Sequence, residues 1–243
     1  MQKREETTLV LSPPARSRMK RVIDVVLASC VLIILSPLFA IIALAILIET
    51  GMPIFYRARR IGIAGRQFTV YKFRTMHVDA EHRLPQLLHL NLGGPHMTRI
   101  PNDPRVTRVG RVLRRTSLDE LPQFWNVLRG DMSIVGPRPQ DLREVELDNA
   151  YQRQRLQCLP GITGLWQVVA RHQNDFDSRI ELDLLYQRQW SLWLDFWIMI
   201  RTPLAMARGI NFNHRADAGK MPVTVDMALD YPEVVVNRED HQP

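Results

Sequence analysis

Two adjacent acids, Asp119 and Glu120, follow a cluster of arginines that includes Arg114. The spacing of Ser117 and Glu120 is that of a capping box, which predicts a helix that begins here with both acids in its first turn. The free N–H groups of a helix N-terminus bind anions, and a divalent ion such as Mg²⁺ commonly joins a carboxylate to phosphate oxygens. This segment could therefore carry phosphoryl chemistry, with one acid attacking phosphorus while the other orients it or takes a proton.

The same residues also fit an ordinary helix cap. A serine at the N-cap and acids in the first turn stabilise a helix whether or not a ligand binds there. The spacing alone does not distinguish a catalytic acid pair from an ordinary helix cap.

The elements expected to position these acids are mostly helices. Strand-like composition predicts short strands at 52–57 and 68–74, with a turn at Gly62 and Gly65 between them. The segment 136–139 is expected to be a rigid turn, and 162–169 a short strand. Apolar periodicity predicts helices at 78–90, 106–115, 117–130, 141–157, 178–190 and 192–209, the last interrupted at Pro203.

An apolar run at 22–48, about 27 residues long, has basic residues on both sides and Ser36-Pro37 in its middle. Proline bends or breaks a helix, and the Ser36 hydroxyl can donate to a carbonyl that the break leaves free. Each half is then too short to cross a hydrocarbon core of about 30 Å alone. Because flanking Lys and Arg favour the cytoplasmic side, we expect a re-entrant hairpin. A kinked helix that spans the bilayer is the alternative.

The composition narrows the class of partner. The chain has 243 residues and a net charge of +7, which favours a membrane surface or a phosphate-rich substrate. No Lys/Arg stripe interleaved with aromatic residues occurs, so nucleic acid is not expected as a partner. The two cysteines, Cys30 and Cys158, cannot build a disulfide framework or a cysteine-based zinc site, which fits a reducing, cytoplasmic location.

Trp190, Trp193 and Trp197 have a spacing that would place them on one face of a helix near the end of the predicted domain. Tryptophan favours the membrane interface, so we expect this helix to lie on a bilayer surface. An ordinary amphipathic helix that packs on the core is the alternative.

Four motifs in a fixed order carry a resemblance to a known family. They are KFRTM at 72–76, TSLDELPQ at 116–123, NVLRGDMSIVGPRP at 126–139 and PGITG at 160–164. In this order they resemble the bacterial sugar transferase family, the monotopic polyprenyl-phosphate phosphoglycosyl transferases, over about residues 16–210. A re-entrant helix broken at Ser-Pro is also a feature of that family.

The resemblance implies a reaction and a set of site residues. Members of the family transfer a sugar-1-phosphate from a UDP-sugar to polyprenyl phosphate and release UMP, through a covalent intermediate on the aspartate of the Asp-Glu pair. Mapped onto this chain, Asp119 is the nucleophile and a Mg²⁺ ligand, and Glu120 is its acidic partner. The cationic side chains expected to bind substrate are Lys72, Arg74, Arg114 and Arg138.

One segment departs from the family pattern. After PGITG the chain continues LWQVVAR at 165–171, where the family often has Trp-Ala-Gln-Val-Asn-Gly-Arg. Arg171 matches, but the Asn-Gly pair is absent, which leaves the local turn and the choice of sugar open. Two other functions also stay open, namely a non-catalytic membrane scaffold of a polysaccharide assembly complex and a polyprenyl-lipid phosphatase.

Together these features predict an α/β, predominantly helical membrane enzyme on the cytoplasmic face of the bacterial inner membrane. Its expected parts are a flexible N-terminal arm at 1–15, a re-entrant membrane helix at 16–50 broken at Ser36-Pro37, a cytoplasmic phosphoglycosyl transferase domain at 51–210 with a small strand element and amphipathic interfacial helices, and a polar C-terminal tail at 211–243. The expected cofactor is Mg²⁺. The expected partners are a UDP-sugar, undecaprenyl phosphate and the phospholipid membrane, and homo-oligomerisation is left open. The expected role is to initiate synthesis of an exopolysaccharide, capsule, O-antigen or other glycoconjugate.

Overall fold

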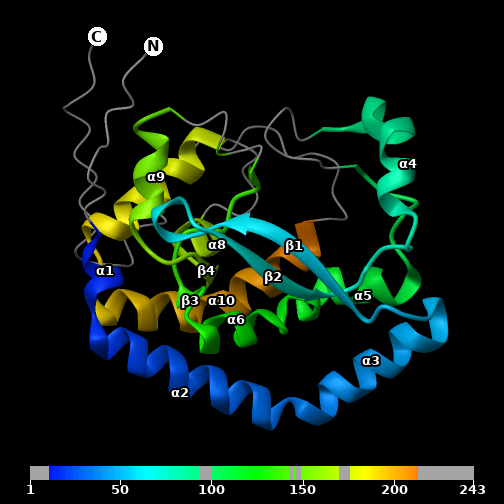
Figure 1. The fold of residues 1–243 in the computed structure, drawn as a ribbon, viewed down its shortest axis with the longest axis horizontal. Coiled ribbons are helices and arrows are strands. Elements are labelled where there is room, and N and C mark those ends of the chain that lie inside the picture. The colour runs from blue at the N-terminus through cyan, green and yellow to red at the C-terminus, as the bar shows by residue number, and fades with distance from the viewer. Residues whose placement is uncertain (1–10, 93–99, 143–144, 146–148, 170–175, 213–243) are drawn as a thin grey trace.

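The computed structural model describes residues 11–92, 100–142, 145, 149–169 and 176–212 (Figure 1). Helices make up most of it, and its strands form two small two-stranded sheets. The sheets and the shorter helices lie above a long bent arm formed by α2 (Arg18–Ile34) and α3 (Ser36–Thr50) (Figure 1). The prediction of a mainly helical fold with a small strand element is confirmed.

The other elements are short. Four described segments are 3₁₀ helices, at Ile63–Gly65 (η1), Leu88–Leu90 (η2), Leu118–Glu120 (η3) and Gln152–Gln157 (η4). The remaining helices and strands, in chain order, are α1 (Pro13–Arg16), β1 (Phe55–Ile61), β2 (Gln67–Phe73), α4 (Ala80–Leu87), α5 (Arg108–Thr116), α6 (Gln123–Arg129), β3 (Ser133–Val135), β4 (Gly161–Thr163), α8 (Leu165–Val169), α9 (Phe176–Arg188) and α10 (Leu192–Phe212).

The bend between α2 and α3 lies where the sequence predicts a break. Pro37 has no N–H to donate to the carbonyl of Ile33, four residues earlier. The Ser36 hydroxyl donates to that carbonyl instead, at 2.8 Å. The chain bends by 59° from the axis of α2 to that of α3. No single helix in the described ranges is long and apolar enough to cross a bilayer. The bent pair of α2 and α3 together has the length and the apolar composition to do so.

The inner face of α2 is fastened to the domain by polar contacts. Lys20 Nζ donates to Asp195 Oδ2 at 2.7 Å. Asp24 accepts a hydrogen bond from the Ser133 hydroxyl at 2.7 Å and from the Ile134 backbone N–H at 3.1 Å. Because Lys20 and Asp24 are buried, this side of α2 belongs to the protein interior.

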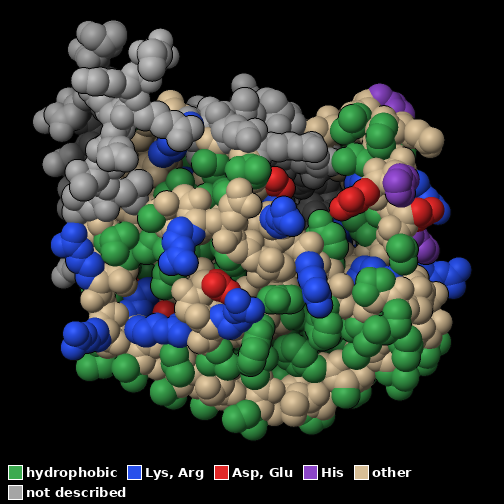
Figure 2. All heavy atoms as spheres, in the orientation of Figure 1, with side chains coloured by type: hydrophobic (Ala, Val, Ile, Leu, Met, Phe, Trp, Pro, Cys, Tyr) green, Lys and Arg blue, Asp and Glu red, His purple; other side chains and the backbone are tan. Residues whose placement is uncertain are grey.

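The outer face of α2 and α3 is apolar and exposed. Figure 2 shows hydrophobic side chains gathered along the edge that these two helices form, with Lys and Arg side chains above them. The exposed aliphatic side chains of this edge include Val22, Val26, Ile33, Ile34, Ile41, Leu44, Leu47 and Ile48.

Ser12 already contacts the folded domain. Both the backbone N–H and the hydroxyl of Ser12 donate to the Gln157 carbonyl, at 3.0 and 3.1 Å. The short helix α1 follows, and Pro14 within it is buried. Residues 12–15, expected in a flexible arm, therefore belong to the folded domain, while 1–10 and the expected tail beyond 212 lie outside the described residues.

Two of the motifs meet at the parallel pair of β3 and β4. A Cβ added to Gly161 would lie 2.1 Å from the Gly136 backbone nitrogen, so only glycine permits this approach. The turn at 136–139 therefore packs against the PGITG segment, although the two are far apart in the sequence.

Three predicted elements differ from the structure. The segment 162–169 is not one strand, because β4 ends at Thr163 and α8 follows. The predicted helix at 141–157 is a 3₁₀ helix over its last six residues, Gln152–Gln157. The helix expected to be interrupted at Pro203 continues through it, since a proline removes only one hydrogen bond of a long, well-packed helix.

α10 buries one side and exposes the other. Leu194 and Ile198 are fully buried in the main core, and Trp197 packs against that core. The exposed side chains on the other side are Trp193, Phe196, Ile200 and Leu204. The three tryptophans expected on one surface are therefore divided, because Trp190 and Trp197 contact the core while Trp193 is 63% exposed.

Candidate active site

The acid pair lies in a 3₁₀ turn between two helices. α5 ends at Ser117, whose φ of 56° lies in the left-handed region and turns its N–H back onto the carbonyls of Leu113 and Arg114. η3 then carries both acids, and α6 begins only after Pro122. The predicted capping box is wrong, because Ser117 closes the preceding helix instead of opening the next one. The acids therefore do not lie in the first turn of an α-helix.

Cations from other elements surround the acids instead. Lys72 on β2 donates to Glu120 Oε1 at 2.8 Å. Arg138, in the turn after β3, reaches the same oxygen with Nη2 at 3.4 Å. The structure thus brings Lys72 and Arg138 together on Glu120, from positions 48 and 18 residues away in the sequence.

Asp119 is half-buried beside Glu120, and it accepts no hydrogen bond from the residues that the structure describes. Burial and then the negative charge of Glu120 raise the pKa of Asp119 to about 6, although the positive charges of three nearby side chains oppose this rise. These side chains are Lys72, Arg114 and Arg138. At neutral pH Asp119 is therefore mostly an ionised carboxylate that is poorly solvated, which is the state of a reactive oxygen nucleophile.

Arg114 approaches Asp119 from α5. Its Nε donates to Thr75 Oγ1 at 2.8 Å, and its charge acts on Asp119. Thr75 belongs to the same motif as Lys72, so this contact ties α5 to the end of the hairpin.

Arg74 does not join the site. It is buried, and its Nη2 donates to the Thr50 hydroxyl and the Gly51 carbonyl, both at 2.6 Å, and to the Thr50 carbonyl at 3.2 Å. These groups lie at the C-terminal end of α3, where a cation stabilises carbonyls that lack helical partners. The structure thus places Arg74 against the end of α3 and not on the acid pair, a placement that the local sequence could not reveal because Thr50 and Gly51 lie more than 20 residues away.

Asn126 has a positioning role that the sequence did not assign. Its side chain closes the free edge of β2, accepting from the Tyr71 N–H at 3.1 Å and donating to the Thr69 carbonyl at 2.6 Å. Since Asn126 is fully buried on α6, it fixes the strand that carries Lys72. The only signal in the sequence was its place at the start of the third motif.

The oxygen atoms present at the acid pair fit Mg²⁺. Among the described residues, no group of three or more His, Cys, Asp or Glu side chains could hold a metal ion. Mg²⁺ is usually held by one or two carboxylates together with substrate phosphates, and Asp119 and Glu120 supply two carboxylates. A Mg²⁺ ion at this site would therefore need phosphate oxygens to complete its ligands.

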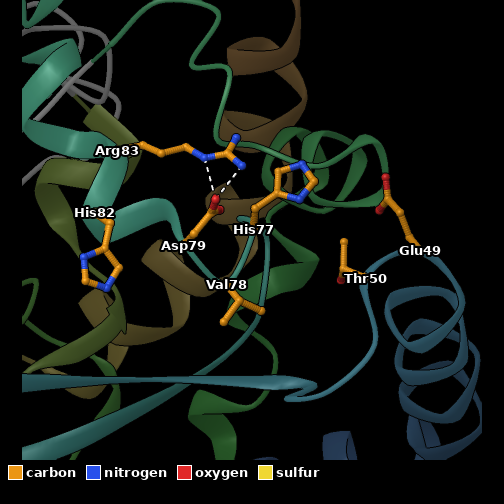
Figure 3. A pocket seen from close by; sticks show the side chains of 7 residues that line it. All are labelled: Glu49, Thr50, His77, Val78, Asp79, His82 and Arg83. Atoms are coloured by element: carbon orange, nitrogen blue, oxygen red, sulfur yellow. Dashed lines mark hydrogen bonds and ion pairs between the residues drawn. The ribbon is translucent and has the colours of Figure 1, made fainter.

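A cavity of about 500 Å³ lies beside the C-terminal end of α3 and includes none of the acids or cations of the site. Figure 3 shows Glu49 on one side of it, the Asp79–Arg83 ion pair on the other, and His77 between them. Glu49 is already engaged, because its carboxylate accepts from the backbone N–H groups of Arg108 and Val109 at 2.7 and 3.0 Å. Glu49 thereby joins α3 to the start of α5. The residues that line the cavity are Glu49, Thr50, His77, Val78, Asp79, His82 and Arg83.

Comparison with known proteins identifies a family and several relatives. The family model described as bacterial sugar transferase matches residues 15–209. The chain is 46% identical over 155 residues to the galactosyl transferase CpsE of Streptococcus agalactiae serotype III (strain NEM316), which covers 63% of this chain and 34% of that protein.

Two further relatives differ in how much of their length is matched. The chain is 40% identical over 211 residues to the exopolysaccharide production protein ExoY of Rhizobium meliloti (strain 1021), covering 84% of this chain and 92% of ExoY. It is 42% identical over 193 residues to the UDP-glucose:undecaprenyl-phosphate glucose-1-phosphate transferase of Escherichia coli (strain K12), covering 76% of this chain and 39% of that enzyme. The chain therefore spans about a third of CpsE and nearly the whole of ExoY. A family match over most of its length places this chain in the bacterial sugar transferase family.

Proposed function

We propose that this protein transfers a sugar-1-phosphate from a UDP-sugar to undecaprenyl phosphate and releases UMP, as the initiating step of an exopolysaccharide, capsule, O-antigen or other glycoconjugate. Family membership and the name of the Escherichia coli relative support the reaction. The name of the Rhizobium meliloti relative supports the pathway class.

One observation carries the mechanism, namely the unequal placement of the two acids. Lys72 and Arg138 both donate to the Glu120 carboxylate. Asp119 keeps a carboxylate to which no described residue donates a hydrogen bond, and its pKa is raised to about 6. Of the two, Asp119 is therefore the one free to attack phosphorus, while Glu120 holds the cations in place.

In the first step a carboxylate oxygen of Asp119 attacks the β-phosphorus of the UDP-sugar. A new P–O bond to Asp119 forms, and the bond from the β-phosphorus to the bridging oxygen breaks. UMP leaves with that oxygen and its electron pair, and the sugar phosphate stays on Asp119. Lys72 and Arg138 lie beside this position, where their charge stabilises the negative charge that develops on the phosphates.

In the second step a phosphate oxygen of undecaprenyl phosphate attacks the phosphorus of the intermediate. The bond to Asp119 breaks, which regenerates its carboxylate and yields the undecaprenyl diphosphate sugar. A route in two steps suits two substrates that arrive from different phases, because each needs the site at a different time.

Mg²⁺ held by Asp119 and substrate phosphates would supply further charge neutralisation on the phosphoryl oxygens. Arg114, fixed by Thr75, keeps positive charge near Asp119 in the absence of any ligand. The protein's own contribution is therefore a set of cations that are already in place before the donor binds.

We further propose that α2 and α3 dip into one leaflet of the inner membrane from its cytoplasmic face. At about 1.5 Å per residue the two helices are roughly 26 and 22 Å long. With their outer ends at one level, a 59° bend lowers the apex by about 12 Å, which is less than half of a ~30 Å hydrocarbon core. The exposed apolar side of α10, including Trp193 and Phe196, supports a contact with the same surface.

The reaction is tested by UMP release from purified protein with Mg²⁺, a panel of UDP-sugars and undecaprenyl phosphate. We expect release that requires the lipid acceptor for turnover and selects one sugar. Asp119→Asn should abolish it, whereas Asp79→Asn, which neutralises an exposed acid away from the site, should not. Release of inorganic phosphate from the lipid would support a phosphatase instead, and no reaction with any donor would support a scaffold.

The membrane placement is tested by the depth of a fluorescent probe attached at position 48, which is exposed near the C-terminal end of α3, in bilayer vesicles. Lipids that carry a quencher at different acyl depths should quench this probe most strongly within the leaflet to which the protein was added. Quenching that is strongest in the opposite leaflet would show a spanning helix and contradict the re-entrant placement.

A further inference from the structure

Arg155 and Asp183 form an ion pair in the interior, next to the turn that carries Arg138. Both are almost completely buried, at 2% and 1% exposure. Arg155 Nη2 donates to the Asp183 carboxylate and also, at 3.2 Å, to the backbone carbonyl of Arg138. The second contact connects a buried guanidinium directly to the backbone of a residue at the candidate site.

Stability alone gives this pair little advantage. Removing two charges from water is costly, and apolar residues of similar size often serve a fold as well or better. Nε and Nη1 of Arg155 are buried and have no hydrogen-bond partner among the described residues, so the pair is not fully compensated. Its contact with the turn is the feature that an apolar replacement could not reproduce.

Other features already restrict most of the turn at 136–139, so that the Arg155 contact is what remains to fix the Arg138 carbonyl. Pro137 and Pro139 restrict the backbone on both sides of Arg138. A Cβ added to Gly136 would lie 2.4 Å from the Leu159 carbonyl oxygen, so the turn is also pressed against the next segment. The Arg138 carbonyl lies within this turn, and Arg155 holds it.

Arg155 is itself held from α9. Asp183 accepts from its guanidinium, and Gln187 Nε2 donates to its backbone carbonyl at 3.0 Å. A continuous set of contacts therefore runs from α9 through Arg155 and the Arg138 backbone to the Arg138 side chain, which reaches Glu120.

We infer that Arg155, fixed by Asp183, is a positioning residue that holds the Arg138 backbone so that the Arg138 guanidinium faces the phosphates of the donor. The part of this inference that concerns the donor rests on the proposed function. The part that concerns the turn rests on the contacts alone.

The test compares Arg155→Met, which keeps much of the side-chain volume, with Arg155→Lys and Asp183→Asn. For Arg155→Met we expect the KM of the UDP-sugar donor to rise roughly tenfold, about the value of one hydrogen bond to a charged group. Arg155→Lys, which keeps a donor and a charge, should recover part of the loss. In an Arg138→Ala background, Arg155→Met should change the donor KM no further, because its effect passes through Arg138.

Leu184→Ala is the matched control, since Leu184 is a buried residue on the same helix that takes no part in these contacts. It should lower the melting temperature and leave the donor KM unchanged. An equal rise of KM in Leu184→Ala would overturn the inference, because it would mean a general effect of destabilisation. An additive effect of Arg155→Met and Arg138→Ala would also overturn it, because the Arg155 effect would then not pass through Arg138.

Hydrogen exchange of the backbone at 135–140 provides a measurement that does not depend on the reaction. Arg155→Met or Asp183→Asn should speed exchange there at least tenfold, with no such change in Leu184→Ala. If the wild type releases no UMP with any donor, the proposed function fails while this measurement still decides the positioning role. Unchanged exchange in both variants would overturn the inference even if the enzyme is active.

Discussion

Replacing the proposed nucleophile should make the folded protein more stable. Asp119→Asn removes a carboxylate whose pKa is raised from 3.8 to about 6 by burial and by the charge of Glu120. A folded-state pKa above the unfolded one means that ionisation of Asp119 opposes folding. The protonated Asp119 side chain therefore favours the folded state. This contribution to stability is fully present below the unfolded pKa of 3.8 and is lost as the pH rises through about 6.

The size of the effect follows from the shift. One pKa unit corresponds to about 1.4 kcal/mol, so the full shift sets a ceiling of about 3 kcal/mol at neutral pH. Asp119 is only half-buried, and solvent screening reduces this figure, so we expect Asp119→Asn to be more stable by about 1–2 kcal/mol. For a chain of this length that corresponds to a rise in melting temperature of roughly 2–8 °C.

The assay is thermal unfolding in Mg²⁺-free buffer, followed by tryptophan fluorescence at about pH 7.5 and about pH 4. Asp119→Asn should melt higher than the wild type at the upper pH, and the difference should vanish at the lower one. Glu120→Gln provides the contrast, because it weakens the contacts with Lys72 and Arg138 and should melt lower than the wild type. A lower melting temperature for Asp119→Asn at about pH 7.5, or a difference that does not depend on pH, would show that ionisation of Asp119 does not destabilise the fold.

Three further predictions concern activity and stability. The rate of UMP release in a single turnover without acceptor should rise with pH through about 6, as Asp119 loses its proton, and a rate independent of pH from about 5 to 8 would contradict this. Arg74→Ala should lower stability by about 2 kcal/mol through the lost contacts with Thr50 and Gly51 but leave the donor KM unchanged, as measured by thermal unfolding and steady-state kinetics. Asn126→Ala should lower both kcat and stability, because the strand that carries Lys72 loses its edge contacts, and a normal kcat in the folded variant would show that the strand is held without it.

The break in the N-terminal helix could be predicted because its cause is local. Proline lacks a donor wherever it occurs, and the preceding serine can reach the carbonyl that is left free. The Ser36 contact with the Ile33 carbonyl has this form. Strand composition likewise located both strands of the hairpin to within a few residues.

The helix boundary at the acid pair could not be predicted because two structures share one pattern. Ser-x-x-Glu opens a helix when the serine is extended, but here Ser117 is left-handed and ends α5. Which of the two forms depends on whether the serine N–H donates to carbonyls of the preceding helix. That in turn depends on how α5 packs, which a local pattern does not encode.

Arg74 shows the same limit for a side chain. It lies two residues from Lys72 in one motif, yet the strand ends at Phe73 and the two side chains go to different partners. The Thr50 and Gly51 groups that bind Arg74 are brought to it by the fold of α3. The buried Arg155–Asp183 pair also joins distant segments and left no recognisable spacing in the sequence.

The most direct test of the mechanism is the intact mass of the protein after mixing with Mg²⁺ and the UDP-sugar that it accepts, without lipid acceptor. We expect the wild type to gain the mass of one sugar phosphate as UMP is released. Fragmentation should place this mass on Asp119, and undecaprenyl phosphate should remove it. Asp119→Asn should gain no mass and release no UMP. Turnover by Asp119→Asn at the wild-type rate, or a sugar phosphate located on another residue, would show that Asp119 is not the nucleophile.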